Sequence, residues 1–243
     1  MSATIGISTG LFKKIYKDSE LGKMLSHSKS LPIDAIQILF ARPNMLKHQF
    51  TDEEIGFLHS LKHVSIHAPF FTDEKGYIDI AFSKNNEWIL DRIEGISEKI
   101  GSSCCVIHSD LIKDPDILIK RKTLFLFENL KKKRNVGSQQ LKALFKTFPQ
   151  IKLVLDVEHA LDWSSGEVDQ LISLFKERIE QIQLSDGDRG FKDFLQNGGN
   201  LERFIPLKKL NCPIIIESKP ESLDALPAVI NKVRAFFLVK DVK

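Results

Sequence analysis

The stretch Leu124-Phe-Leu-Phe-Glu128-Asn129 determines the fold that we predict for this chain. Bulky apolar residues occupy consecutive positions in it, which is typical of a strand buried on both faces in a parallel sheet covered by helices. An ionised glutamate at the end of such a strand is costly to bury unless something neutralises its charge. The stretch therefore predicts a buried strand that carries a chemically significant group at its C-terminal end.

Four further runs of the sequence end in the same way. Lys152–Asp156 and Pro213–Glu217 end in carboxylates, whereas Val64–His67 and Cys104–His108 end in histidines. Five strand-like runs thus place a potential metal ligand at the same end. We interpret the five residues as converging on a divalent metal ion.

Eight strand candidates alternate with helical patterns along the chain. The other three strand candidates are Thr4–Ser8, Ala35–Phe40 and Ile179–Leu184. Two helical signals are clear: a capping box from Thr51 to Glu54, and an apolar stripe at helical spacing that ends before Gly101. The stripe consists of Ile89, Ile93, Ile96 and Ile100. The pattern predicts an α/β fold, a single (β/α)8 TIM barrel over residues 1–243, with the active site at the C-terminal ends of the strands. A doubly wound open sheet is the competing architecture.

Composition indicates an ordinary globular protein. The 243 residues are 42% hydrophobic and 28% charged, and the net charge of +3 permits a polyanionic partner without favouring one. Three cysteines form neither a disulfide framework nor a zinc spacing, so we expect a reducing, cytoplasmic location. No apolar run approaches membrane-spanning length and no signal peptide is evident, so we expect no membrane partner.

A set of six motifs resembles the xylose isomerase-like barrel superfamily, which includes sugar isomerases and epimerases, hydroxypyruvate isomerase and endonuclease IV. The motifs are His67-Ala-Pro, His108, Glu128-Asn, Asp156-Val-Glu-His159, Gln183-Leu-Ser-Asp186 and Glu217. The resemblance covers roughly Val64 to Glu217. Six motifs in the right order on successive strands are specific for the fold and the metal site, but not for the reaction.

The resemblance implies a set of metal ligands. Glu128, Asp156 and Glu217 match the family's metal-binding carboxylates, and the alternative for each is a buried pair with a lysine or arginine. Gln183 stands where many members carry a histidine, although hydroxypyruvate isomerase resembles this chain in having glutamine there. A neutral oxygen at that position favours Mg²⁺ or Mn²⁺ over Zn²⁺. We expect no nucleotide cofactor.

The resemblance also implies roles for histidines. His67 and His108 match positions that bind a second metal in endonuclease IV, and equivalent groups contact substrate in isomerases. His159 would serve a further metal, the substrate or catalysis. The third metal of endonuclease IV requires an Asp-x-His sequence after strand seven, whereas this chain has Asp188-Arg189-Gly190.

Three further features of the predicted catalytic face have functional interpretations. Asp186 and Arg42 are candidate substrate contacts. The basic run Lys131–Arg134 could hold a phosphate or nucleic-acid backbone, or form a solvated loop.

Three functions compete. The first is a metal-dependent isomerase or epimerase of a sugar, sugar phosphate or hydroxy acid, in which Glu128 and Glu217 exchange a proton through an enediolate. The second is an endonuclease IV-like phosphodiesterase acting on abasic DNA, and the third is a non-catalytic barrel descendant. We favour the first, with a small hydroxy-carbonyl substrate, and expect DNA as a partner only under the second. The sequence does not reveal the substrate or the oligomeric state.

Overall fold

The protein is described by a computed structural model that covers residues 3–114, 116–185, 202–218 and 222–238. Eight parallel strands pair in sequence order, and β1 also pairs with β8, so the barrel is closed. This closure confirms the (β/α)8 prediction and rules out the open doubly wound sheet. The strands are β1 (Ile5–Ser8), β2 (Ala35–Leu39), β3 (His63–His67), β4 (Cys104–Ile107), β5 (Phe125–Glu128), β6 (Lys152–Asp156), β7 (Ile179–Leu184) and β8 (Ile214–Ile216).

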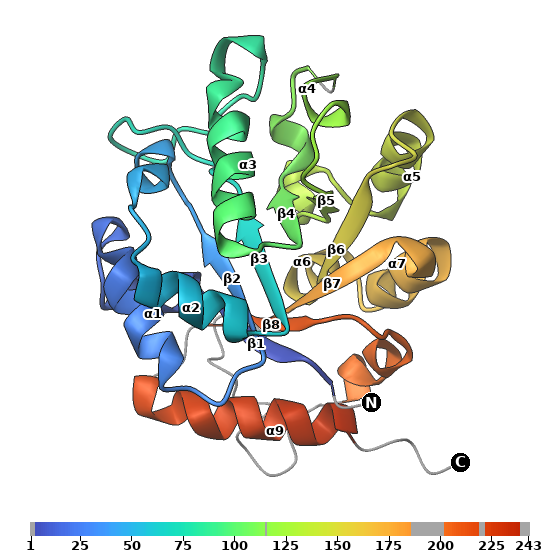
Figure 1. Ribbon diagram of the computed structural model, residues 1–243. Helices are drawn as coiled ribbons and strands as arrows, with labels where there is room; N and C mark the ends of the chain where they lie inside the picture. Colours follow the sequence, from blue (N-terminus) through green and yellow to red (C-terminus); the bar gives the residue numbers. More distant parts are fainter. Residues whose placement is uncertain (1–2, 115, 186–201, 219–221, 239–243) are drawn as a thin grey trace.

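Helices surround the strands, as Figure 1 shows. The α-helices are α1 (Leu21–Lys29), α2 (Asp52–Ser60), α3 (Trp88–Ile100), α4 (Asp116–Ile119), α5 (Ser138–Thr147), α6 (Val157–Trp163), α7 (Glu167–Phe175) and α9 (Leu226–Leu238). The 3-10 helices are η1 (Thr9–Lys14), η2 (Asp18–Glu20), η3 (Pro43–Lys47), η4 (Lys84–Asn86), η5 (Ser109–Leu111), η6 (Lys132–Arg134), η7 (Lys176–Arg178), η9 (Glu202–Lys209) and η10 (Leu223–Ala225). The described barrel strands span Ile5 to Ile216, and one domain over residues 1–243 stays a prediction.

Local sequence explains where the helices begin and end. Thr51 accepts a hydrogen bond from the amide of Glu54, whose carboxylate accepts one from the amide of Thr51, so the predicted capping box starts α2. The four isoleucines of the α3 stripe are at most 2% exposed. Gly101 ends α3 with a φ of 66°, a left-handed conformation that glycine adopts without steric cost.

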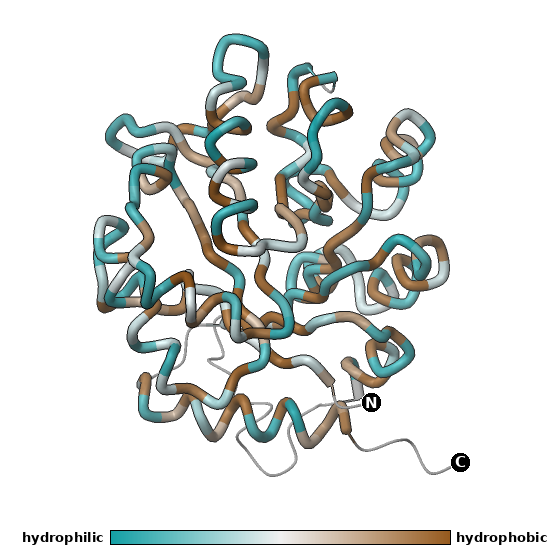
Figure 2. The backbone as a smooth tube through the Cα atoms, viewed as in Figure 1, coloured by the Kyte–Doolittle hydropathy of each residue, from teal (hydrophilic) through white to brown (hydrophobic). Residues whose placement is uncertain are grey.

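Two separate cores lie on the two sides of the barrel wall. The large core packs alternate residues of each strand against the helices. Figure 2 shows brown, hydrophobic stretches along the barrel strands and mixed colours along the outer helices. The other strand residues face the barrel interior, because side-chain direction alternates along a strand. Only Cys104, Val106, Leu126 and Val154 form a buried apolar cluster there among the described residues. The interior also contains fully buried polar side chains: Gln37, Ser65, Gln181 and Gln183.

None of the described helices has both the length and the apolar character needed to cross a membrane.

Candidate metal centre

The C-terminal ends of the strands bring the predicted site residues to one end of the barrel. His67, Glu128 and Asp156 are the last residues of β3, β5 and β6. Glu217 directly follows β8, His108 directly follows β4, and Gln183 is the penultimate residue of β7. All eight strands run in parallel in a closed barrel, so these residues lie at the same end of it.

Glu128 lies at the centre of three imidazoles. Its Oε2 is 3.1 Å from His67 Nε2 and 3.4 Å from His108 Nε2, while its Oε1 is 3.0 Å from His159 Nδ1. The Glu128 side chain is only 3% exposed. Burial raises the pKa of this carboxyl, but His108, His159 and His67 outweigh burial and hold it well below its usual range. The lowered pKa favours the ionised form of Glu128, whose two oxygens face different partners and can each bind a cation.

Asp156 and His159 meet because of a helix start that the sequence patterns did not predict. Asp156 caps α6, and its Oδ1 accepts a hydrogen bond of 2.7 Å from the His159 amide. The first helical turn then returns His159 Nδ1 to within 3.6 Å of Asp156 Oδ2. Burial lowers the pKa of His159, but Asp156 and Glu128 outweigh it and raise it to about 10. Burial raises the pKa of Asp156 to about 6.

Hydrogen bonds fix the orientation of the other two histidines. His67 Nδ1 lies 2.9 Å from the carbonyl oxygen of Ala68, so Nδ1 donates there and Nε2 faces Glu128. Phe70 stacks on the His108 ring at 5.2 Å with an interplanar angle of 17°. His108 Nδ1 is buried and has no hydrogen-bond partner within the described part of the chain.

Glu217 is held by two glutamine amides. Gln37 Nε2 donates to Glu217 Oε1 over 2.5 Å, and Gln183 Nε2 donates to the same oxygen over 3.0 Å. Burial raises the pKa of Glu217 to about 7, with further contributions from the charges of Asp156 and Glu128. The carbonyl oxygen of Gln183 is buried and has no hydrogen-bond partner among the described residues.

The donor chemistry fits a divalent metal ion. Ligand atoms of His67, His108 and Glu128 lie within 4.8 Å of one another, and so do those of Glu128, Asp156 and His159. Glu217 belongs to neither of these groups in the described part of the chain. The unpaired oxygen of Gln183 is a neutral donor of the kind that Mg²⁺ and Mn²⁺ accept. The histidine-rich group has the character that Zn²⁺ prefers.

Of the two candidate substrate contacts Arg42 and Asp186, the structure describes only Arg42. Arg42 directs its guanidinium at the backbone carbonyls of Thr72, Glu74 and Gly76 in the loop after β3. Arg42 therefore helps to hold this loop in place. A substrate role for Arg42 stays a prediction. Asp186 and Asp188–Gly190 lie outside the described residues.

The basic run Lys131–Arg134 is engaged by acidic neighbours. Lys131 Nζ lies 2.5 Å from Glu158, and Arg134 pairs with Asp79 at 2.9 Å and Asp110 at 2.7 Å. These ion pairs connect loops at the mouth of the barrel, and they compete with any phosphate for the two basic groups.

Two contributors to the site were not predicted from the sequence. The Asn129 side chain donates to the Asp156 carbonyl and accepts from the Asp156 amide, both at 2.8 Å, which joins the ends of β5 and β6. Gln37 was missed although it interrupts the apolar run Ala35-Ile-Gln-Ile-Leu39. A polar residue inside a buried strand is the signal that would have identified it.

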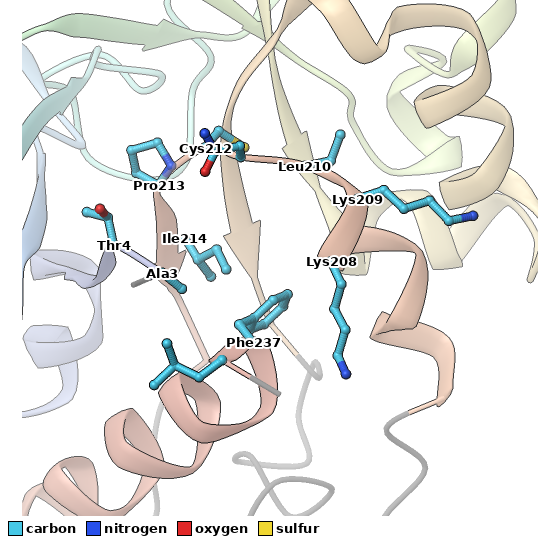
Figure 3. Close-up of a pocket in the computed structure, with 11 residues that line it drawn as sticks. Ala3, Thr4, Lys208, Lys209, Leu210, Cys212, Pro213, Ile214 and Phe237 are labelled. Carbon is cyan, nitrogen blue, oxygen red and sulfur yellow. The ribbon is translucent and has the colours of Figure 1, made fainter. Parts of the chain in front are cut away.

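A cavity of about 550 Å³ lies at the opposite end of the barrel. Thr4 and Pro213, which line it, directly precede β1 and β8, and Phe237 of α9 lines it as well (Figure 3). It is therefore separate from the strand ends that carry the metal-ligand candidates.

Comparisons with known proteins define the fold. No protein-family model matches the chain, and no curated protein matches it. The D-allulose 3-epimerase of Methylomonas sp., solved with D-allulose, is 14% identical with a TM-score of 0.62 over 94% of this chain and 90% of its own. An AP endonuclease, family 2, of Brucella melitensis is 15% identical with a TM-score of 0.65 over 91% and 95%. A xylose isomerase domain-containing protein of Salmonella typhimurium is 13% identical with a TM-score of 0.62 over 98% of both chains.

The chain thus has the fold of the xylose isomerase-like TIM barrels. The similar structures include a sugar epimerase and an AP endonuclease, so the fold is compatible with more than one reaction.

Proposed function

We propose that the protein is a divalent-metal-dependent isomerase or epimerase of a sugar, sugar phosphate or related hydroxy-carbonyl compound. One observation carries the proposal: buried Glu128 ends strand β5, and partly buried Glu217 directly follows strand β8 at the same mouth of the barrel. Their charges are close enough that Glu128 contributes to the raised pKa of Glu217. The likeness to a D-allulose 3-epimerase supports this class of reaction.

The two glutamates would exchange a proton with the substrate. One removes a proton from the carbon next to the carbonyl, and the other returns a proton to the resulting enediolate. The imidazole of His159 contacts Glu128 at 3.0 Å, so it can hold that carboxylate in place or relay its proton.

Metal binding would use Glu128, Asp156, Gln183 and Glu217, with His159 adjacent. When bound, the ion would polarise the substrate carbonyl and stabilise negative charge that develops on oxygen. The free carbonyl oxygen of Gln183 supports this ligand set, because a buried acceptor without a donor is rare in folded proteins.

Deuterium exchange tests the proposal. The protein loaded with Mn²⁺ or Mg²⁺ is incubated in D₂O with a panel of ketoses, their phosphates and hydroxypyruvate. We expect deuterium at the carbon next to the carbonyl of one substrate, and loss of this exchange in Glu128→Gln and Glu217→Gln. Exchange that persists in both variants would overturn the assigned acid–base pair.

A second candidate function is supported by a different observation. Glu128 is shared by the two ligand groups, and one of them contains His67 and His108, an arrangement suited to two neighbouring zinc ions. An endonuclease IV-like phosphodiesterase would therefore contain two or more Zn²⁺ per chain and cleave an abasic duplex. His108→Ala would abolish that cleavage. Metal analysis that finds one Mn²⁺ or Mg²⁺ per chain favours the isomerase, and no bound metal of any kind favours a non-catalytic barrel.

A further inference from the structure

Polar side chains cross the barrel interior in an unbroken series. The series starts at exposed Ser103, before β4, and continues through His63 at the start of β3 to Gln181 on β7, Gln37 on β2 and Glu217 after β8. We call these five residues the axial column. It connects the N-terminal opening of the barrel with the end that holds the candidate metal centre.

The bonds of the axial column are short, and the bond between its two glutamines is buried. Ser103 Oγ lies 3.0 Å from His63 Nδ1, and His63 Nε2 lies 2.9 Å from Gln181 Oε1. Gln181 Nε2 lies 2.6 Å from Gln37 Oε1, and Gln37 Nε2 lies 2.5 Å from Glu217 Oε1. Gln37 and Gln181 are fully buried. The side-chain amides of both glutamines are therefore removed from water and form hydrogen bonds within the column instead.

The chemistry of the paired groups determines which atom donates and which accepts in each bond of the column. An amide nitrogen only donates hydrogen bonds, so Glu217 Oε1 accepts from Gln37 Nε2. The oxygen of Gln37 then accepts from Gln181, whose own oxygen accepts from His63 Nε2. The Nδ1 atom of His63 faces the Ser103 hydroxyl, which also lies 3.0 Å from the Val64 carbonyl oxygen. Three donors, His63 Nε2, Gln181 Nε2 and Gln37 Nε2, thus point toward Glu217, and aligned hydrogen bonds polarise and strengthen one another.

We propose that the axial column is a positioning device for Glu217, with Gln37 and Gln181 as the positioning residues. The column fixes one carboxylate oxygen, Oε1, and so assigns Oε2 to the ligand in the barrel mouth. This role for Glu217 rests on the proposed function, in which Glu217 binds metal and transfers a proton. The column does not itself conduct protons, because neutral amides interrupt any chain of exchangeable acid and base groups.

The barrel interior supports this role over simple space filling. Its other buried cluster, Cys104, Val106, Leu126 and Val154, is apolar. Apolar residues at positions 37 and 181 would extend that packing without requiring hydrogen bonds. The chain instead contains two amides and an imidazole whose bonds all lead to one carboxylate.

Manganese binding and crystal structures test the proposal. Gln181→Met removes the nearer of two donors to Gln37 Oε1, the other being Gln183 Nε2 at 3.4 Å, and Gln181 is not itself a candidate ligand. Gln37→Met removes the nearer of the two direct donors to Glu217. We expect Mn²⁺ affinity, read by EPR of free and bound Mn²⁺, to fall about 10-fold in Gln37→Met, as for other partners that orient metal ligands, and to fall less in Gln181→Met. The EPR line shape of bound Mn²⁺ should change in both variants.

Ser65→Ala is the matched control. Ser65 is buried, is the register partner of Gln37 on the neighbouring strand, and its hydroxyl has no hydrogen-bond partner among the described residues. It should leave both the affinity and the EPR spectrum unchanged.

Metal-free crystal structures separate the two proposals. In Gln181→Met, the amide of Gln37 and the carboxylate of Glu217 should leave the positions that they hold in the wild type. Unchanged positions, or unchanged Mn²⁺ binding in both folded variants, would overturn the positioning role. If the wild-type protein binds no divalent ion, the proposed function fails, while the Glu217 position in these structures still decides the role of the column.

Discussion

At the residue scale, Asn129 joins the ends of β5 and β6, which carry the candidate metal ligands Glu128 and Asp156. Its side chain bonds both the amide and the carbonyl of Asp156, and it is 1% exposed. An alanine there would leave two buried backbone groups of Asp156 without partners. The position of Asp156 relative to Glu128 thus depends on a buried side chain that is not itself one of the candidate metal ligands.

Asn129→Ala should lower both stability and metal affinity. Losing two buried hydrogen bonds costs about 1–3 kcal/mol for each unsatisfied group. Urea unfolding measures the stability, and Mn²⁺ titration measures the affinity. Asn211→Ala, at an exposed position, is the control and should change neither. An unchanged midpoint for Asn129→Ala would show that water replaces both bonds.

His63 gives stability a pH dependence. Burial lowers its pKa from the usual 6.5, although the bond to Gln181 opposes this. The unfolded chain therefore binds a proton at His63 more readily than the folded chain does. The stability contributed by neutral His63 is present above about pH 6.5 and is lost as pH falls through that value toward the lower folded pKa.

The comparison of His63→Gln with the wild type isolates this effect from other histidines. The unfolding free energy of the wild type should fall more steeply between pH 7.5 and 5 than that of His63→Gln, because glutamine does not titrate. His59→Gln, at an exposed position, should follow the wild type. Parallel pH profiles for all three proteins would contradict the buried neutral state of His63.

At the element scale, the loop after β3 forms a short hairpin clamped by Arg42. Phe71 and Asp79 pair in an antiparallel bridge, and the Thr72 amide donates to the Ile78 carbonyl over 2.8 Å. The Arg42 guanidinium binds three carbonyls of this loop and lies 5.7 Å from the Phe71 ring centroid. Arg42 therefore holds the hairpin to the loop after β2, together with the Phe71 amide bond to the Ala41 carbonyl and the Asn44 amide bond to Asp73.

Arg42→Met should loosen the hairpin without unfolding the barrel. We expect faster hydrogen exchange at the amides of Thr72 and Ile80, because methionine cannot donate to the three carbonyls. Lys47→Met, in the same connection between β2 and α2, is the charge-matched control. Unchanged exchange would show that the bridge and the Arg134–Asp79 ion pair suffice to hold the loop.

Element patterns also explain which parts of the structure were predictable. Strands such as β5 and β8 were found because they bury continuous apolar runs, and α2 and α3 because of a capping box and a four-residue stripe. The prediction missed α6 because its seven residues follow β6 without an intervening loop. A helix that begins directly after the last strand residue is not preceded by the loop residues that usually mark a helix start.

At the scale of the whole molecule, the site combines residues that local patterns can and cannot identify. Candidate metal ligands at strand ends, such as Glu128, can be predicted from the sequence because parallel strands end at one face of the barrel. The bond between Gln37 and Gln181 joins residues 144 positions apart, and it depends on barrel closure and on which parity faces inward. Such pairings across the interior follow only from the assembled barrel.

Metal binding should stabilise the whole barrel, because its candidate ligands come from the ends of β5, β6, β7 and β8. An ion that binds only the folded chain adds about 2.7 kcal/mol when its concentration is 100 times Kd. For a chain of this length that is roughly a 5–10 °C rise in Tm, and EDTA should reverse it. Scanning calorimetry with Mn²⁺, Mg²⁺ and Zn²⁺ measures the shift. Asp156→Asn should abolish it, whereas Asp52→Asn, exposed at the start of α2, should retain it. A rise that survives in Asp156→Asn would mean that the ion binds elsewhere, and the convergence of strand ends would then have another purpose.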